Sequence, residues 1–388
     1  MSAVAIKGWC PGALRPMQSG DGLVVRIRPR GGRIDARQAA GVAALAERYG
    51  NGLIDLTGRA NLQIRGVSDA SHTPLIDGLA RLGLLDSDGA AEARRNILVT
   101  PFWGAGDDVT ALAAELEGAL AVGPAGLPTK FGFAVDCGEE RVLTGASADI
   151  RIERDIAGGL IVRADGVERG CAVTRAEAVP AALALAEWFV TSAGAANGRR
   201  RMAAHLGAGA RLPEAFRADV RLSRARAVPH PACYPLGVMI GVAFGQLTHA
   251  ALADLAGRVQ GLRLTPWRMI LAEGLQEMPR DDNVFITRAD DPRLRVVACS
   301  GAPACSEALA DTRTLVAALA PYLAADSRLH VSGCAKGCAQ SGPASITLVA
   351  TPNGFDLIRD GSTRDAPVRH GLSKADLVAD PAILVGGR

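Results

Sequence analysis

An internal duplication constrains the fold of this chain more than any other feature of its sequence. Residues 31–67 and 244–275 each run from a glycine-containing turn through a helical stretch into strands, and the second copy has the shorter helix. The matched positions are Gly32 with Gly245, Leu45 with Leu255, Thr57 with Thr265, and Gly66 with Gly274. With the strand that precedes it, each copy predicts the order strand, helix, strand, strand. Such internal self-similarity indicates a pseudo-symmetric fold.

The first copy shows why these elements are expected. Residues 23–28 alternate as a half-buried strand requires. Asp35 and Gln38 have the spacing of a capping box, and Gly50 ends the helical pattern that follows. In the last strand four polar side chains share one face, and these are Arg59, Asn61, Gln63 and Arg65. That face is either an anion-binding platform or a solvated side of the sheet.

Two α/β segments accompany the copies. The first, about residues 94–228, has strands near 97–99 and 160–162 and a helix near 181–192. The second has strands at 295–298, 328–332 and 345–349, a helix at 307–324 and a short helix from Cys334. The predicted fold is α+β, with the boundaries 1–90 for the first half-repeat and N-terminal segment, 91–228 for the first α/β domain, 229–294 for the second half-repeat, and 295–388 for the second α/β domain.

Four of the eight cysteines form two spaced pairs at predicted strand ends. Five residues separate Cys299 from Cys305, and three separate Cys334 from Cys338. Neighbouring strand ends in one α/β layer would bring the four thiols together, and such loops suit a [4Fe–4S] cluster. Structural zinc more often uses tight Cys-x2-Cys knuckles. The spacing alone also allows four ordinary buried cysteines.

Composition excludes several classes of protein and places the cysteines in a reducing compartment. The net charge of +3 and the absence of a basic run exclude a nucleic-acid-binding arm. No apolar stretch approaches the roughly 18–20 residues that span a bilayer, and residues 1–12 show no export signal. We therefore expect a cytoplasmic protein whose paired cysteines bind metal. The unpaired cysteines, predicted to have no such role, are Cys10, Cys137, Cys171 and Cys233.

Three further motifs resemble those of the sulfite and nitrite reductase family. LTGRANLQIRGV at 56–67 is similar to the strand that places an arginine at the substrate face, ARRNILVTP at 93–101 to a second arginine motif, and LPTKFGFAVDCG at 127–138 to a lysine motif. The resemblance runs from about residue 22 to residue 350. It implies a nitrite/sulfite reductase-like fold with two ferredoxin-like half-repeats and two α/β domains of the sirohaem and Fe–S type. It also implies that Cys299, Cys305, Cys334 and Cys338 ligate a [4Fe–4S] cluster.

Two departures point to one branch of this family. Gly132 stands where the reductases usually have a second lysine, and Lys336 stands where they usually have asparagine. Losing a cation weakens a site for a small oxyanion. The segments CPGALRPMQSGDGLVVRI at 10–27 and SGCAKGCAQ at 332–340 resemble an oxygen-dependent branch. Its members are monooxygenases of aerobic cobalamin (vitamin B12) biosynthesis that hydroxylate precorrin-3A to precorrin-3B and close a γ-lactone.

The resemblance implies cofactors, partners and contacts as well. The cluster would relay electrons, a non-haem iron is allowed and sirohaem is disfavoured. Partners would be precorrin-3A, O2 and a reductase or NAD(P)H-linked donor, with no nucleic acid or membrane. The expected substrate contacts are Arg59, Asn61, Gln63, Arg65, Arg95, Lys130 and Lys336. The catalytic groups are not identified, because the six histidines form no spaced pair for an iron triad. The alternatives are a sirohaem-dependent sulfite or nitrite reductase, a non-catalytic tetrapyrrole or cluster carrier, and a zinc-stabilised structural protein.

Overall fold

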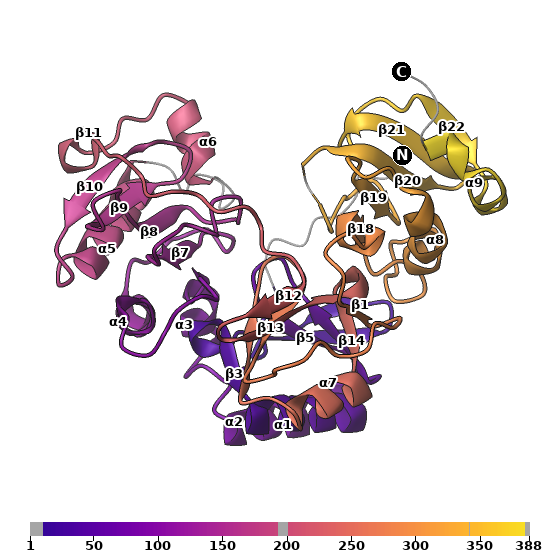
Figure 1. Cartoon of the computed structure of the whole chain (residues 1–388), viewed down its shortest axis with the longest axis horizontal. Helices are drawn as coiled ribbons and strands as arrows, with labels where there is room; N and C mark the ends of the chain where they lie inside the picture. The colour runs from indigo at the N-terminus through magenta and orange to yellow at the C-terminus, as the bar shows by residue number, and fades with distance from the viewer. Residues whose placement is uncertain (1–10, 193–200, 341, 385–388) are drawn as a thin grey trace.

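The computed structural model describes residues 11–192, 201–340 and 342–384, so Cys10 lies outside the described residues. Two α/β lobes stand on a common base and give the molecule the shape of a V (Figure 1). The base is built from the two repeat copies, the first lobe from the segment between them, and the second lobe from the segment after them. This arrangement confirms the α+β, pseudo-twofold fold predicted from the sequence.

The base contains two antiparallel sheets, each made mainly from one repeat copy. The first has the order β1 (Met17–Ser19), β2 (Gly22–Ile27), β5 (Leu62–Val67), β4 (Leu53–Leu56) and β14 (Gln246–Thr248). The second has the order β12 (Ala232–Tyr234), β13 (Gly237–Val242), β16 (Met269–Glu273), β15 (Gly261–Leu264) and β3 (Arg33–Asp35), with β17 (Phe285–Ile286) paired to β13. Helices α1 (Ala36–Tyr49), α2 (Asp69–Arg81) and α7 (His249–Ala256) cover the outer side of the base (Figure 1).

Each of these sheets takes its last strand from the other copy. Strand β3 pairs with β15, where Ile34 faces Leu262, and β14 pairs with β4, where Leu247 faces Ile54. All four of these side chains are fully buried in one hydrophobic core. The two copies therefore share a core, and the boundaries drawn at residues 90, 228 and 294 stay predictions.

The backbone repeats the duplication that the sequence shows. Gly32 and Gly245 have φ values of 69° and 71°, and Gly66 and Gly274 have 69° and 75°. These left-handed conformations favour glycine, which has no Cβ to clash. The capping box at the start of α1 is present, because Asp35 accepts a hydrogen bond from the Gln38 amide and its own amide donates to Gln38. Helix α1 has 14 residues and α7 has 8, as the shorter second copy predicted.

The two lobes share a topology in which three parallel strands are followed by antiparallel ones. The strands of the first lobe are β6 (Ile97–Val99), β7 (Phe133–Asp136), β8 (Ile150–Arg154), β9 (Leu160–Ala164), β10 (Arg169–Val173) and β11 (Ala218–Asp219). Its helices are α3 (Gly89–Arg94), α4 (Asp108–Val122), α5 (Ala178–Thr191) and α6 (Met202–Gly207). The second lobe contains β18 (Val296–Ala298), β19 (Leu329–Ser332), β20 (Ala344–Thr351), β21 (Gly354–Gly361), β22 (Arg369–Leu372), α8 (Thr312–Leu319) and α9 (Lys374–Ala379).

Two predicted helices of the second lobe are wrong in extent or in kind. The helix expected at 307–324 begins only at Thr312, because the Leu309 amide donates to the Gly333 carbonyl and Asp311 caps the helix start. The helix expected from Cys334 is a series of turns. Gly337 has φ +60° there, which interrupts a right-handed helix. No helix of the described residues is long and apolar enough to cross a membrane.

One buried histidine predicts how stability depends on pH. His330 on β19 is fully buried, and neither ring nitrogen has a hydrogen-bond partner among the described residues. Burial and the nearby charge of Arg268 lower its pKa from 6.5 to about 4. Because the folded pKa lies below the unfolded one, the neutral ring supports the fold above pH 6.5, and that stability is lost as the pH falls towards 4.

We expect this loss to be about 3 kcal/mol, since one pKa unit corresponds to about 1.4 kcal/mol. The variant His330→Leu should therefore lose less stability than the wild type between pH 6.5 and pH 4. At pH 7 it should be at least as stable, because leucine buries no unpaired polar atom. Thermal unfolding across this pH range tests the effect, and equal acid sensitivity of the two proteins would contradict it.

Candidate functional site

The two cysteine pairs lie on adjacent loops of the second lobe. Cys299 follows β18 directly, and Cys334 follows the end of β19, the parallel neighbour of β18. The Gly333 amide donates a hydrogen bond to Cys299 Sγ at 3.1 Å, so the two loops are in contact. The Cys305 amide bonds to the Gly301 carbonyl at 2.8 Å and closes the first loop back towards Cys299.

The four thiols lie within electrostatic reach of one another. Burial raises the pKa of Cys338, and thiolates at Cys334, Cys299 and Cys305 raise it further. Burial likewise raises the pKa of Cys334, with added effects from Cys299 and Cys305. Cys338 is exposed as a residue although its thiol is partly buried, and the other three cysteines are half-buried. Among the described residues no three His, Cys, Asp or Glu side chains gather closely enough to hold a single ion. A cubane needs four thiolates around a larger volume.

Glycines let the main chain pass close to the sulfurs. A Cβ on Gly333 would lie 3.4 Å from Cys299 Sγ and 2.6 Å from the Ala308 Cβ. Gly301 has φ +68° and a Cβ there would lie 2.7 Å from the Thr312 amide. A side chain at Gly333 would therefore not fit between the two loops, and one at Gly301 would collide with the start of α8.

A cation close to Cys299 also fits a negatively charged group. Arg268 has φ +59°, and its Nη1 is buried without a hydrogen-bond partner among the described residues. Burial and Arg313 lower its pKa to about 10, whereas Asp55 and a Cys299 thiolate favour its charged form. Gly245 makes room for it, since a Cβ there would lie 2.9 Å from Arg268 Cδ. Four thiols beside an unpaired guanidinium donor fit the [4Fe–4S] group that the sequence predicts.

Sequence reasoning missed Arg268. It stands at the position of Ala60 in the first copy, and both residues have left-handed backbones, with φ values of 59° and 53°. An alanine replaced by an arginine at equivalent positions of a duplication is a signal that the sequence already contained. A left-handed conformation is costly for a non-glycine residue, and such residues cluster at functional sites.

Two of the expected substrate contacts meet where the base joins the first lobe. Arg59 is half-buried and its Nη2 donates to the Lys130 carbonyl at 2.7 Å. The Lys130 side chain is exposed. On β5, Gln63 is half-buried. Asn61 is buried in the preceding turn, where its amide bonds to Thr57 Oγ1 at 3.2 Å.

The other expected contacts are already engaged with carboxylates of the protein. Arg65 is buried, and although burial opposes its charge, hydrogen bonds to Asp21 and Asp55 raise its pKa. Arg95 is buried too, and although burial opposes its charge, hydrogen bonds to Asp86 and the negative charge of Glu117 raise its pKa. Lys336, between the last two cysteines, pairs with Glu307 at 3.1 Å, with 18% of its side chain exposed. The structure therefore places these three cations in protein networks, and their role towards a substrate stays a prediction.

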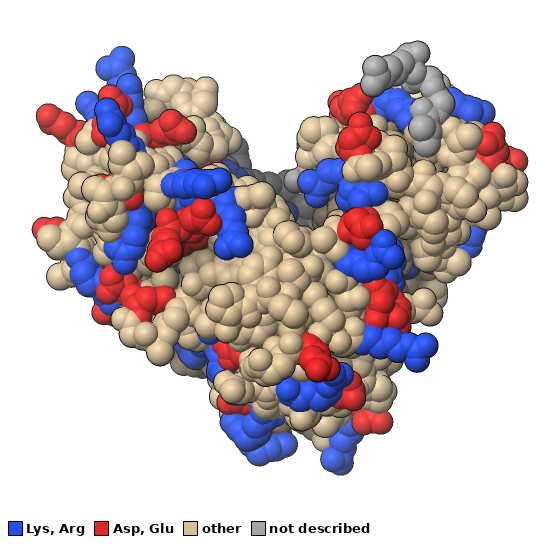
Figure 2. Space-filling model, in the orientation of Figure 1, with Lys and Arg blue, Asp and Glu red and all other residues tan. Residues whose placement is uncertain are grey.

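The surface between the lobes has a distinct charge pattern. Figure 2 shows a hollow between the two lobes whose floor, over the base, is largely uncharged. Lys and Arg side chains lie on both of its rims, with Asp and Glu side chains among them. A largely uncharged floor with some cations at its edges is suited to a flat ligand that carries several carboxylates.

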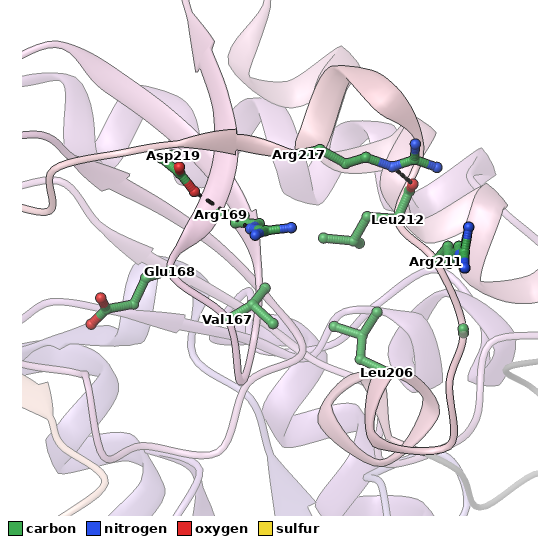
Figure 3. Close-up of a pocket in the computed structure, with 9 residues that line it drawn as sticks. Val167, Glu168, Arg169, Leu206, Arg211, Leu212, Arg217 and Asp219 are labelled. Atoms are coloured by element: carbon green, nitrogen blue, oxygen red, sulfur yellow. Dashed lines mark hydrogen bonds and ion pairs between the residues drawn. The ribbon is translucent and has the colours of Figure 1, made fainter.

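Two cavities lie in the first lobe. One, of about 930 Å³, is lined by Thr100, Cys137 and Arg154, at the strand ends that correspond to the cysteine loops of the second lobe. Another, of about 590 Å³, opens beside β11 and α6 (Figure 3), where Asp219 pairs with Arg169 at 3.4 Å. Neither contains the paired cysteines.

Comparisons with known proteins agree with this geometry. Residues 15–82 match the family model of the nitrite/sulfite reductase ferredoxin-like half domain. The fold is similar to that of the Mycobacterium tuberculosis NirA protein, with a TM-score of 0.55 and 17% identity over 92% of this chain and 79% of that one. The structural match and the matched half domain thus define a nitrite/sulfite reductase-like fold.

A relative among curated proteins narrows the family. The chain is 32% identical over 400 residues to a Sinorhizobium protein named precorrin-3B synthase, which covers 93% of this chain and 84% of that protein. The chain belongs to the precorrin-3B synthase family and is an enzyme of that family.

The close approach at Gly333 predicts a specific sensitivity. Gly333→Ala should lower the cluster content of the purified protein severalfold, because its Cβ would push Ala308 and Cys299 apart, and overpacking costs about 1–3 kcal/mol. Iron and sulfide analysis measures the effect. Gly342→Ala is the matched control, since a Cβ at Gly342 meets nothing within 4 Å. Full cluster content in Gly333→Ala would show that the loops have more freedom than their packing indicates.

Proposed function

We propose that this enzyme is an oxygen-dependent monooxygenase of aerobic cobalamin biosynthesis that hydroxylates precorrin-3A to precorrin-3B and closes a γ-lactone. The observation that carries the proposal is the 32% identity, over 93% of the chain, to a protein named precorrin-3B synthase. In the overall reaction one oxygen atom of O2 enters the substrate and the other leaves as water. A reductase or an NAD(P)H-linked donor supplies two electrons, and two protons are taken up.

Four residues would hold the redox group. Cys299 and Cys305 from the first loop and Cys334 and Cys338 from the second would ligate a [4Fe–4S] cluster, for which the contact between the two loops supports a shared site. When bound, such a cluster supplies electrons one at a time. Arg268 would offset its negative charge through the buried Nη1. Cys338 is exposed, and we propose that it faces the substrate side.

The substrate would be held through its carboxylates. We propose that Arg59 and Lys130 bind acetate or propionate groups at the junction of base and first lobe, while Gln63 and Asn61 serve as neutral donors. Arginine suits this role because its planar fork pairs with a carboxylate through two hydrogen bonds. Lys336 beside the cysteines is the third cation that we assign to the substrate. The hollow between the lobes, with its largely uncharged floor, is the surface on which we place the macrocycle.

Arg65 and Arg95 would act on the substrate only through other residues. Their guanidinium groups are buried and already bonded to Asp21 and to Asp86, with distances of 2.7 Å in both pairs. A buried pair of this kind loses stability when one partner is drawn away. We therefore propose that they fix the positions of neighbouring elements.

The test is an anaerobic preparation from cells that can make sirohaem, analysed for iron, sulfide and visible absorption and then supplied with precorrin-3A, a reductant and 18O2. The proposal expects about four sulfides per chain, a broad cluster spectrum, and one labelled oxygen atom in the product. Sharp sirohaem bands with sulfite or nitrite turnover would identify a reductase. Tight binding of precorrin-3A without product would identify a carrier, and a colourless zinc protein would overturn the cluster as well.

A further inference from the structure

The turn between β1 and β2 is packed directly against the loop that carries Cys305. A Cβ on Gly20 would lie 2.6 Å from the Pro303 carbonyl oxygen and 2.7 Å from the Ser306 amide nitrogen, so only glycine allows this approach. Ser19 Oγ donates to the Ala304 carbonyl at 2.7 Å. The main chain on both sides of Cys305 is therefore held by a hairpin 285 positions earlier in the sequence.

Arg65 completes this contact from beneath. Its Nη2 donates to the same Ala304 carbonyl at 2.8 Å, and its side chain is only about 5% exposed. Asp21 binds the guanidinium at 2.7 Å and Asp55 binds it at 3.2 Å, which leaves it no freedom to turn towards a ligand. Arg313, at the start of α8, pairs with Asp55 at 3.0 Å and ties the same network to the second lobe.

The second repeat copy has an equivalent ion pair next to the first lobe, in which the acidic and basic residues have exchanged positions. Asp55 and Arg65 of the first copy correspond to Arg263 and Glu273 of the second, through the match of Thr57 with Thr265. Arg263 binds Glu273 and donates to the carbonyls of Pro101 and Trp103 at 2.7 and 2.6 Å. Both halves thus fix a loop at the root of one lobe through carbonyl groups. Only the loop held by Arg65 carries a cysteine of the site.

We propose that Arg65, with Ser19 and Gly20, is a positioning residue that fixes the Cys305 loop so that its thiolate is preset to ligate the cluster. This inference rests on the cluster assignment and is independent of the substrate and of the reaction. It assigns to Arg65 a role other than contact with the tetrapyrrole. A preset ligand slows cluster loss, because a thiolate that lets go stays close to its iron and binds again.

The test compares Arg65→Lys with Arg263→Lys in the cluster-loaded full chain, without substrate. Lysine keeps the positive charge near each carboxylate but cannot reproduce the fork of hydrogen bonds. We expect Arg65→Lys to release iron to a chelator roughly tenfold to a hundredfold faster than the wild type, the range set by hydrogen bonds to charged groups. Arg263→Lys should stay within about twofold of the wild type, because its carbonyl partners belong to the other lobe. Ser19→Ala, which removes one hydrogen bond and no charge, should show a smaller acceleration.

Several outcomes would overturn the inference. Iron release from Arg65→Lys at the wild-type rate would show that the loop needs no support. Equal acceleration in Arg65→Lys and Arg263→Lys would indicate a general loss of stability, which thermal unfolding of both variants would reveal. A raised KM for precorrin-3A in Arg65→Lys with unchanged iron release would instead indicate that Arg65 contacts the substrate. Failure of the wild type to take up any cluster would instead overturn the cofactor assignment, and this inference with it.

Discussion

Replacing Cys334 with alanine should abolish the cluster and reduce turnover of precorrin-3A at least a hundredfold. Cys334 begins the second cysteine loop, next to the Gly333 amide that bonds to Cys299 Sγ. A cubane with three protein thiolates lacks one of its four anchors, and loss of a metal ligand is among the changes that disrupt a site most. Iron and sulfide analysis, with anaerobic absorption spectra, measures the first effect, and the oxygen-dependent assay measures the second.

The control for this prediction is Cys233→Ala. Cys233 lies on β12 of the base, is exposed, and belongs to neither cysteine loop. The Cys233→Ala variant should retain full cluster content and turnover. Normal iron and sulfide in Cys334→Ala would remove this residue from the ligand set and require a different fourth ligand.

Replacing Arg59 with methionine should weaken binding of precorrin-3A by roughly tenfold to a hundredfold, because a hydrogen-bonded carboxylate partner contributes about 1.5–3 kcal/mol. Arg59 is half-buried beside the Lys130 carbonyl, and methionine keeps much of its apolar length. The cluster should be unaffected, since the hydrogen bond from Arg59 goes to the Lys130 carbonyl at the junction with the first lobe. Anaerobic titration with precorrin-3A, followed by the absorption of the ligand, gives the dissociation constant.

Arg258→Met is the matched control for Arg59→Met. Arg258 follows α7, is exposed, and pairs with Asp254 at 3.4 Å on the outer side of the base. It should bind precorrin-3A as the wild type does. If both variants bind equally well, the junction between base and first lobe is not the carboxylate site, and Lys336 becomes the leading cation.

Local patterns predicted much of this structure because they express local physics. The alternation at residues 23–28, the capping box at Asp35 and the stop at Gly50 appear as β2 and the two ends of α1. The spacing of the four cysteines placed them at neighbouring strand ends, since parallel strands must end at one edge of a sheet. The duplicated glycines Gly66 and Gly274 mark turns whose backbone few other residues adopt.

The remaining features depend on contacts between distant segments, and local patterns do not contain these. In the sequence Arg65 is one of four polar residues predicted on a strand face. Only the folded chain brings Asp21 and Asp55 into contact with it. The ion pair of Arg95 with Asp86 is likewise formed only in the folded chain. The delayed start of α8 follows from the bond between the Leu309 amide and the Gly333 carbonyl, which joins two loops far apart in the sequence. His330 is a strand residue whose lack of hydrogen-bond partners is visible only in the packed lobe.

The exchange of β3 and β14 between the half-repeats also sets an order of events during synthesis. Strand β4 has an open edge until the ribosome has made Gln246–Thr248, and β3 has no partner until β15 emerges. An unpaired edge attracts other strands, so a nascent first half is exposed to wrong pairing while the whole first lobe is being translated. The two halves must consequently mature together, and a split of the gene between them would yield two fragments that complete each other's sheets by association.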